Sequence, residues 1–488
     1  MPAAGTRDSP PPTTPRWIRA AERCGRDDAW TPDRLPHRPG SARSDVGGER
    51  ATWKAGRMRS ERLGDGGSAA DVFRALARRA RSRELAPPAG LIGNWFDAAA
   101  VIAPSVRAAP HDARSAFTLP PRGTGPDPTP GDPIVGGGWI GYRAYPDRSG
   151  ILPEAAGGWT DHVLRLDNSG CWWFESLLDE PCPEDLVDAV RRPDAVPGPW
   201  HIDWTTPDRH AHRRGVEDCL DAIARGDVYQ ACVCARFHGT SSGRPVDFFA
   251  DAVDRTRPGR AAFVQGDWGA VASLSPELFL SRRGGTVTSS PIKGTLPLIE
   301  DPARLRNSVK DVAENVMIVD LVRNDLGRVA DAGSVRVTDL LRVKPAPGVW
   351  HLVSTVTAAV SDRVSAADLL DAAFPPASVT GCPKHSARTL LRAWEPDPRG
   401  VYCGAVGMHS PLAGLELNVA IRTVEFDAAG RVGLGVGGGI TIDSDPDAEW
   451  QECLDKASSI VTLTQSRTLP DPIPASRNAP GDPVSAPT

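Results

Sequence analysis

The chain has 488 residues, of which 40% are hydrophobic and 24% are charged, and its formal net charge at pH 7 is −5. This length can bury one large core or two domains, and this charge gives no electrostatic attraction to nucleic acid. No apolar run reaches the roughly 18 residues that indicate a membrane span. The nine cysteines are scattered and odd in number, so we expect reduced thiols in a cytoplasmic protein.

Composition along the chain predicts four regions. Residues 1–85 are rich in Pro, Arg, Asp and Gly, so we expect a disordered extension with at most one short helix, at 69–82. Residues 86–205 begin with strand-like alternation and form an amino-terminal region, followed by the main folded domain at 206–466. Residues 467–488 are expected to form a disordered tail. The sequence leaves open whether translation begins at Met1 or Met58.

The central region alternates strand and helix patterns, and several of the strands follow one another directly. This order predicts an α+β fold with antiparallel pairing and helices outside. The expected strands are 262–266, 270–274, 286–289, 404–410, 416–425 and 432–437. The expected helices are 216–224, 303–322, 366–373, 384–394 and 448–464.

Lys293 stands between Ile292 and Gly294, after a strand-like run. This is an unusual place for a solvating charge and a suitable one for an amine held against a ligand. An ordinary lysine has a pKa of about 10.4, so a nucleophilic lysine must be desolvated or set beside other cations. The alternative interpretation is a surface lysine in a turn.

Two pairs of carboxylates, each on a predicted helix, are candidate metal ligands. Asp311 and Glu314 are three residues apart, as are Glu449 and Glu452, so each pair lies side by side on its helix. Mg²⁺ binds a few carboxylates, several waters and an anionic ligand. The sequence therefore predicts a magnesium site, and solvated helix faces are the alternative.

Nine segments occur together in an order that resembles the chorismate-utilising enzymes. They are 226–230 (GDVYQ), 274–279 (LSPELF), 291–295 (PIKGT), 313–327, 349–354 (VWHLVS), 374–384 (FPPASVTGCPK), 400–404 (GVYCG), 420–423 (AIRT) and 437–440 (GGGI). The resemblance runs from about Val216 to about Thr464. It implies two stacked antiparallel β-sheets flanked by helices, with 206–466 as the chorismate-binding catalytic domain and the amino-terminal region built into the same sandwich.

The resemblance also implies how substrate and metal are held. Mg²⁺ would be held by Glu314 and Glu452 directly, and by Asp311 and Glu449 through water. The ion would then bind the ring carboxylate of chorismate. Other side chains and amides would hold the rest of the substrate, namely Ser378, Tyr402, Arg422, Gly437, Gly438, Gly439 and Lys456.

Lys293 marks the group within this family that resembles aminodeoxychorismate synthase component I, because anthranilate synthase component I usually has alanine there. The resemblance then implies a covalent Lys293 adduct at C2 and amination at C4. Glu277 would act as acid and base, which needs a pKa raised by burial. His351 would donate to the substrate, although a histidine in an apolar run is also typical of a core residue.

The expected ammonia source is a separate glutaminase subunit, because none of the nine cysteines lies in a Gly-x-Cys-x-Gly nucleophile motif. Three alternatives remain: anthranilate synthase component I, an isochorismate or salicylate synthase, and an inactive homologue. The second is disfavoured by Gln230, because an amide cannot act as a general base. The sequence leaves open whether the product serves folate or a specialised pathway, and whether tryptophan binds.

Overall fold

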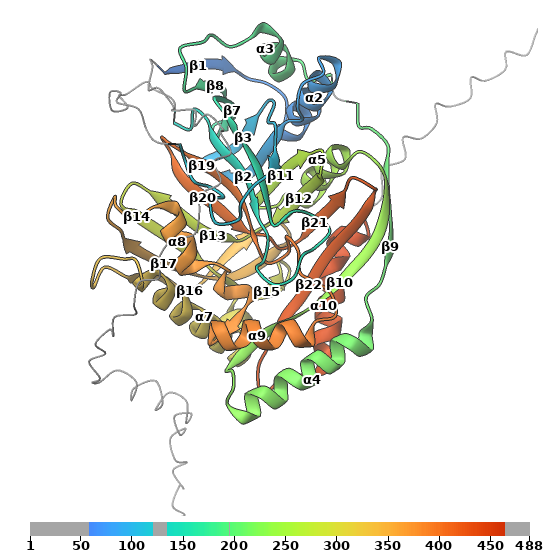
Figure 1. Ribbon diagram of the computed structural model, residues 1–488, viewed down its shortest axis with the longest axis vertical. Coiled ribbons are helices and arrows are strands. Elements are labelled where there is room, and N and C mark those ends of the chain that lie inside the picture. Colours follow the sequence, from blue (N-terminus) through green and yellow to red (C-terminus); the bar gives the residue numbers. More distant parts are fainter. Residues whose placement is uncertain (1–57, 121–133, 195, 464–488) are drawn as a thin grey trace, which may run out of the picture. The chain divides into compact units, whose positions relative to one another are not determined.

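Two antiparallel β-sheets with helices on their outer faces make up the part of the chain that the computed structural model describes, residues 58–120, 134–194 and 196–463 (Figure 1). This arrangement confirms the predicted α+β fold class. Strands from the amino-terminal region and from the main domain occur in both sheets, so the two regions share their layers.

The first sheet has twelve strands. Along its edge-to-edge order they are β1 (Arg59–Gly64), β8 (Trp172–Ser176), β7 (His162–Asp167), β3 (Ala98–Ala103), β2 (Ala89–Trp95), β11 (Arg260–Gly266), β12 (Gly269–Ser275), β21 (Thr423–Asp427), β22 (Arg431–Ile440), β10 (Gln230–Gly243) and β18 (Gly381–Cys382), with β9 (Trp200–Thr205) pairing with β10.

The second sheet has ten strands. Their order is β15 (Ile292–Pro297), β17 (Val349–Ala359), β14 (Thr286–Ser290), β13 (Leu278–Arg283), β20 (Gly414–Val419), β19 (Ala405–Ser410), β5 (Gly138–Arg143), β6 (Ala155–Thr160) and β4 (Ala109–Pro110), with β16 (Arg336–Ala346) pairing with β17.

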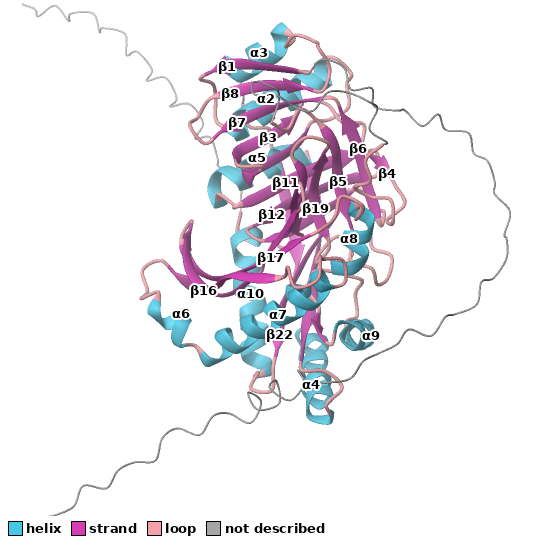
Figure 2. Cartoon of the chain, turned by 90° about the vertical axis from the view of Figure 1, so that its left-hand side faces the viewer, coloured by secondary structure: helices cyan, strands magenta, loops and turns pink. Residues whose placement is uncertain are grey.

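Helices cover the outer face of each sheet, and an apolar layer fills the space between the sheets. Along the chain they are α2 (Ala69–Ser82), α3 (Glu184–Arg191), α4 (Arg209–Arg225), α5 (Pro245–Thr256), α6 (Ala303–Asn307), α7 (Val309–Gly327), α8 (Ala366–Ala373), the short 3₁₀ helix η1 (Ala377–Val379), α9 (Lys384–Trp394) and α10 (Pro446–Val461). Helices α2, α5 and α10 pack on the first sheet, and α7 and α8 on the second. Figure 2 shows α7, α9, α10 and β22 at the same end of the strands. No helix in the described ranges is long and apolar enough to cross a membrane.

The expectation that residues 1–85 are disordered is wrong for residues 58–85. The helix expected at 69–82 is present as α2, with Ser68 as its N-cap and with Val72, Phe73 and Leu76 in the core. Strand β1 was not expected, because it has few apolar residues. It forms by pairing with β8, which is more than a hundred residues away in the sequence. Residues 1–57, and the tail expected at 467–488, lie outside the described residues.

Two predicted elements are broken where the sequence pattern was continuous. The helix expected at 303–322 is divided at Ser308, whose hydroxyl accepts from the Asp311 amide and so caps α7. The strand expected at 416–425 is divided between β20 and β21, and Arg422 in the break has a positive φ of 50°. Both breaks lie beside the candidate site.

Candidate active site

Lys293 on β15 is paired with Glu314 on α7. The Lys293 Nζ lies 2.5 Å from Glu314 Oε1, and both side chains are largely buried. Burial alone would lower the pKa of Lys293, but the Glu314 carboxylate outweighs that effect and raises it. The sequence argument expected a lowered pKa. The structure corrects it, because the nucleophile candidate has a carboxylate as its nearest partner.

The other predicted metal ligands lie around this pair. Lys310 on α7 reaches across to α10, with its Nζ 2.8 Å from Glu449 Oε1 and 3.7 Å from Glu452 Oε2. Asp311 lies against β15, since a Cβ added at Gly294 would be 3.0 Å from Asp311 Cγ. Helices α7 and α10 therefore bring all four predicted carboxylates to one end of the sheets.

Glycines on β22 leave the space that these carboxylates occupy. A Cβ added at Gly438 would lie 2.8 Å from Glu449 Oε2, and one at Gly439 would lie 2.0 Å from Glu314 Oε1. Strand β21 pairs with β22 only over residues 432–434, so the segment that includes Gly437 has β10 on one edge and no described strand on the other. The Gly437 carbonyl accepts from Lys456, and backbone amides along such an unpaired edge can bind an anionic ligand.

The residue types at this place fit a magnesium ion. Its preferred ligands are oxygens, and Glu449 Oε2 is buried without a hydrogen-bond partner. Within the described ranges, however, no group of three or more His, Cys, Asp or Glu side chains is placed to hold a metal. Lys293, Lys310 and Lys456 lie among the carboxylates and pair with them.

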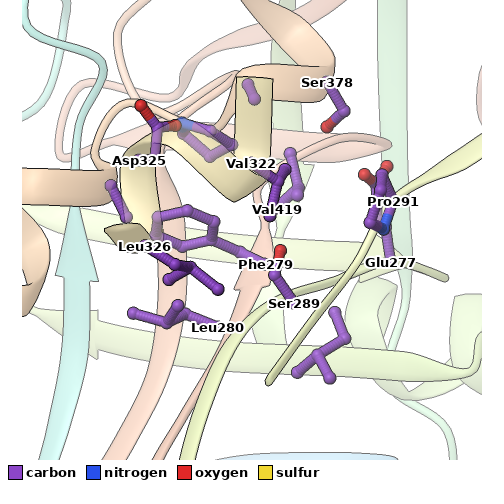
Figure 3. A pocket seen from close by; sticks show the side chains of 14 residues that line it. Glu277, Phe279, Leu280, Ser289, Pro291, Val322, Asp325, Leu326, Ser378 and Val419 are labelled. Carbon is purple, nitrogen blue, oxygen red and sulfur yellow. The ribbon is translucent and has the colours of Figure 1, made fainter. Parts of the chain in front are cut away.

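Glu277 lies immediately before β13, beside the same centre. Burial raises the pKa of its carboxyl to about 7, although a hydrogen bond from Ser378 and the charge of Lys293 both favour the ionised form. Ser378 lies on η1 and is also buried. Figure 3 shows Glu277 and Ser378 on one side of a small cavity, with Asp325 and Leu326 on the other. A carboxyl with this pKa can both give and take a proton near neutral pH.

His351 and Arg422 complete this part of the site. The Thr295 hydroxyl lies 3.0 Å from His351 Nδ1, and burial together with the charge of Arg422 lowers the pKa of His351 to about 4, so the ring is neutral at pH 7. Burial also lowers the pKa of Arg422, an effect that Glu277 partly offsets. Among the described residues, the Arg422 guanidinium makes no hydrogen bond or ion pair, so it is available to an anion.

Tyr402 and Lys456 both contact β22 at or just before Gly437, the first residue of the glycine segment. The Tyr402 ring covers Gly435, where an added Cβ would be 2.2 Å from Tyr402 Cγ. The Lys456 Nζ donates to the Gly437 carbonyl at 2.8 Å and pairs with Glu452 at 2.7 Å. In this structure the Lys456 ammonium is therefore paired with a candidate metal ligand, Glu452, and is not a free charge for the substrate.

Sequence reasoning missed three polar residues of this centre. Lys310 is four residues before Glu314 on one helix face, and that spacing could have identified it. Gln230 was considered only as a residue that cannot act as a general base. Its Oε1 is buried without a hydrogen-bond partner, and a Cβ added at Gly439 would lie 3.1 Å from that atom. Thr295 gave no signal, because only the pairing of β15 with β17 brings it to His351.

Comparison with known proteins agrees with this geometry. Residues 131–462 match the family described as chorismate binding enzyme. This match covers well over half of the chain, which therefore belongs to the chorismate-binding enzyme family.

Several curated relatives are similar over most of their length. Aminodeoxychorismate synthase component 1 of Escherichia coli is 38% identical over 332 residues, 64% of this chain and 70% of that protein. The Klebsiella aerogenes protein of the same name is 38% identical over 364 residues, 70% of this chain and 80% of its own. Anthranilate synthase component 1 of Streptomyces coelicolor is 33% identical over 384 residues, 69% and 75% of the two chains.

Solved structures share the fold. Anthranilate synthase component I from Streptococcus pneumoniae has a TM-score of 0.60 at 23% identity, covering 88% of this chain and 95% of that one. The menaquinone-specific isochorismate synthase from Escherichia coli has a TM-score of 0.61 at 17% identity, covering 83% and 94%. At these identities the likeness concerns the fold alone.

Proposed function

We propose that this chorismate-binding enzyme is an aminodeoxychorismate synthase component I, a transferase that converts chorismate and ammonia to 4-amino-4-deoxychorismate. The observation that carries the proposal is that two buried groups, the Lys293 amine and the Glu277 carboxyl, lie close enough for each charge to affect the pKa of the other. Burial also raises the pKa of Glu277. The identity to curated proteins of that name supports the same activity.

Chorismate has two carboxylates, and the site offers cationic and amide partners for both. The ring carboxylate would face the α7 and α10 carboxylates across Mg²⁺, held by Glu314 and Glu452 directly and by Asp311 and Glu449 through water. When bound, the ion would supply charge neutralisation for the substrate carboxylate.

The enolpyruvyl carboxylate would lie on the other side of the site. Arg422 suits it because a guanidinium fork matches a carboxylate through two hydrogen bonds. Tyr402 and the amides of Gly437, Gly438 and Gly439 would add donors, and Lys456 would contribute charge through Glu452. Ser378 and the neutral ring of His351 would hydrogen-bond the substrate without adding charge.

The first chemical step needs Lys293 as the free amine, so its ammonium must first lose a proton. The Glu314 carboxylate raises the pKa of Lys293, and a cation held by Glu314 would offset that effect. The Lys293 Nζ bonds to C2, the two ring double bonds shift, and the C4–O bond breaks. Protonated Glu277 gives its proton to the departing hydroxyl, which leaves as water. The lysine nitrogen carries the positive charge that the step creates, so atoms and charge balance.

The second step reverses the shift. Ammonia bonds to C4, the double bonds move back, and the C2–N bond breaks, returning Lys293 as a free amine. Glu277, ionised by the first step, takes a proton from the new C4 ammonium group. Its pKa of about 7 suits both transfers, since neither protonation state is strongly favoured at neutral pH.

Ammonia would come from a separate glutaminase subunit. No cysteine of the chain lies in a Gly-x-Cys-x-Gly motif, so the chain should not hydrolyse glutamine itself. We expect ammonium salts alone to support the reaction, better at high pH where NH₃ is populated. Robust glutamine-dependent turnover by the purified chain alone would contradict this expectation.

Anthranilate synthase component I is the second candidate, supported by the 33% identity to the Streptomyces coelicolor protein. Mass spectrometry of the product formed from chorismate, Mg²⁺ and ammonium separates the two. The proposal predicts 4-amino-4-deoxychorismate. Anthranilate as the main product would favour the second candidate, and isochorismate or salicylate would exclude both.

A further inference from the structure

A small cavity behind Glu277 has a lining unlike the rest of the site. Its walls are mostly apolar, and they include Phe279 from β13, Val322 and Leu326 from α7, and Val419 from β20 (Figure 3). Glu277 itself lies in the wall. The cavity therefore connects an apolar interior directly to the proposed acid and base.

The size of the cavity limits what can enter it. Its free interior has room for about one molecule of the size of water. Chorismate, a ring with two carboxylates, is far too large, and its charges would lose their hydration against these apolar walls. A small molecule without charge is the ligand that fits.

We propose that this cavity is the subsite that holds ammonia before it adds to the ring, and that its size excludes larger amines. This inference rests on the proposed amination, in which Glu277 takes the proton that the incoming nitrogen releases. Ammonia has the size of water and no charge at the moment of attack. Ammonium would lose the water molecules that hydrate its charge if it entered this apolar cavity, which is unfavourable.

The chemistry places the waiting molecule beside its proton acceptor. As the new N–C4 bond forms, the C2–N bond to Lys293 breaks, and one proton passes from the new ammonium to the Glu277 carboxylate. Ammonia held in the cavity takes the place that a water molecule would otherwise fill, which protects the covalent intermediate, because water bound there would compete for C4.

An ion pair closes the far side of the cavity. The Lys384 Nζ donates to Asp325 Oδ2 at 2.6 Å, and to the carbonyls of Ala373 and Pro375 at 2.8 Å each. All three donors of the ammonium are used, and the bonds hold the segment that leads to Ser378 against α7. Because the Asp325 carboxylate is already paired with the Lys384 ammonium, it does not attract an ammonium ion into the cavity.

Val322 provides a direct test, with a matched control on the same helix. Val322 lines the cavity, whereas Val319 is buried to nearly the same extent, 5% exposed against 6%, and does not line it. Val322→Ala should admit methylamine, which adds at C4 to give the 4-methylamino product. We expect the ratio of methylamine to ammonium turnover to rise about tenfold, the usual discrimination for one methyl group. Val319→Ala should leave that ratio unchanged.

A second variant narrows the space. Val322→Met should raise the KM for ammonium while leaving the KM for chorismate unchanged, since the substrate ring does not enter the cavity. Thermal unfolding of both alanine variants shows whether their folds are equally intact.

Equal amine ratios in Val322→Ala and Val319→Ala, with an unchanged ammonium KM in Val322→Met, would overturn the cavity proposal while leaving the amination intact. Wild-type enzyme that forms no 4-amino product from ammonium would overturn the proposed function and the cavity with it.

Discussion

Lys293 Nζ lies 2.5 Å from Glu314 Oε1, so the proposed nucleophile has as its counter-ion a carboxylate that is also a proposed magnesium ligand. This ion pair joins strand β15, which carries the lysine, to helix α7, which carries the carboxylate. This relationship gives consequences that can be measured separately at each residue.

Glu314→Gln should preserve the fold, because the change is isosteric, and should weaken Mg²⁺ and chorismate together, since each ligand completes the other's site. Glu452→Gln should act in the same way. Asp320→Asn, on the exposed face of the same helix, is the control. Calorimetry with each ligand in the presence and absence of the other measures the coupling. Chorismate affinity that does not respond to Mg²⁺ or to either substitution would exclude the bridging arrangement.

Glu277→Gln should lower turnover by about 10²- to 10⁴-fold, the usual contribution of a general acid and base. The same change should stabilise the protein above pH 7. A buried carboxyl with a pKa of about 7, against 4.5 unfolded, contributes stability that is present below pH 4.5 and lost as pH rises through 7. The loss is about 3 kcal/mol and is absent in the glutamine variant. Denaturant unfolding at pH 4.5 and pH 8 measures it. Equal pH dependence in both proteins would show that Glu277 ionises normally.

His351 should not titrate between pH 6 and 8. Its pKa of about 4 follows from burial and from the charge of Arg422, so the ring acts as a neutral hydrogen-bond partner. A nuclear magnetic resonance titration of labelled histidine, with His351→Gln to assign the signal, tests this directly. A midpoint near 6.5 would mean that the ring is hydrated and far from Arg422.

Arg422→Lys should weaken chorismate about 10- to 100-fold, because an ammonium cannot form the two parallel bonds of a guanidinium. Arg422 has a positive φ of 50°, which most side chains avoid, and residues in such strained conformations cluster at functional sites. Arg431→Lys, at an exposed position at the turn end of the β21–β22 hairpin, is the control. Unchanged chorismate affinity in Arg422→Lys would place the enolpyruvyl carboxylate elsewhere.

The fold was largely predictable because its local patterns agree with its tertiary contacts. The helices α8 and α9 have the predicted bounds, since their apolar spacing and flanking residues suffice. Strand β1 was not predictable, because its pairing with β8 is remote in sequence. The break at Arg422 was also missed, because its positive φ of 50° is a backbone feature that the strand-like sequence pattern does not reveal.

The sequence predicted that several side chains of the candidate site lie together, but it did not predict Lys310, Gln230 or Thr295, nor the electrostatics of the site. Their spacing places Asp311 and Glu314 on one face of a helix. No local sequence pattern indicates that Glu314 forms an ion pair with Lys293, twenty-one residues earlier. The raised pKa of Lys293 follows mainly from this contact. The spacing of Lys310 from Glu314 indicates a shared helix face, but its pairing with Glu449 and Glu452, which lie on a different helix, has no local signal.

The central claim is that Lys293 forms a covalent bond to C2, and Lys293→Ala tests it most directly. Formation of 4-amino-4-deoxychorismate should fall by several orders of magnitude, while chorismate binding survives through Mg²⁺ and Arg422. A trace of 2-amino product or anthranilate should appear, because ammonia can then attack C2 in the vacated space. Lys293→Arg should not restore activity, since a guanidinium stays protonated. Formation of the C4-amino product at near wild-type rate by Lys293→Ala would contradict the covalent mechanism.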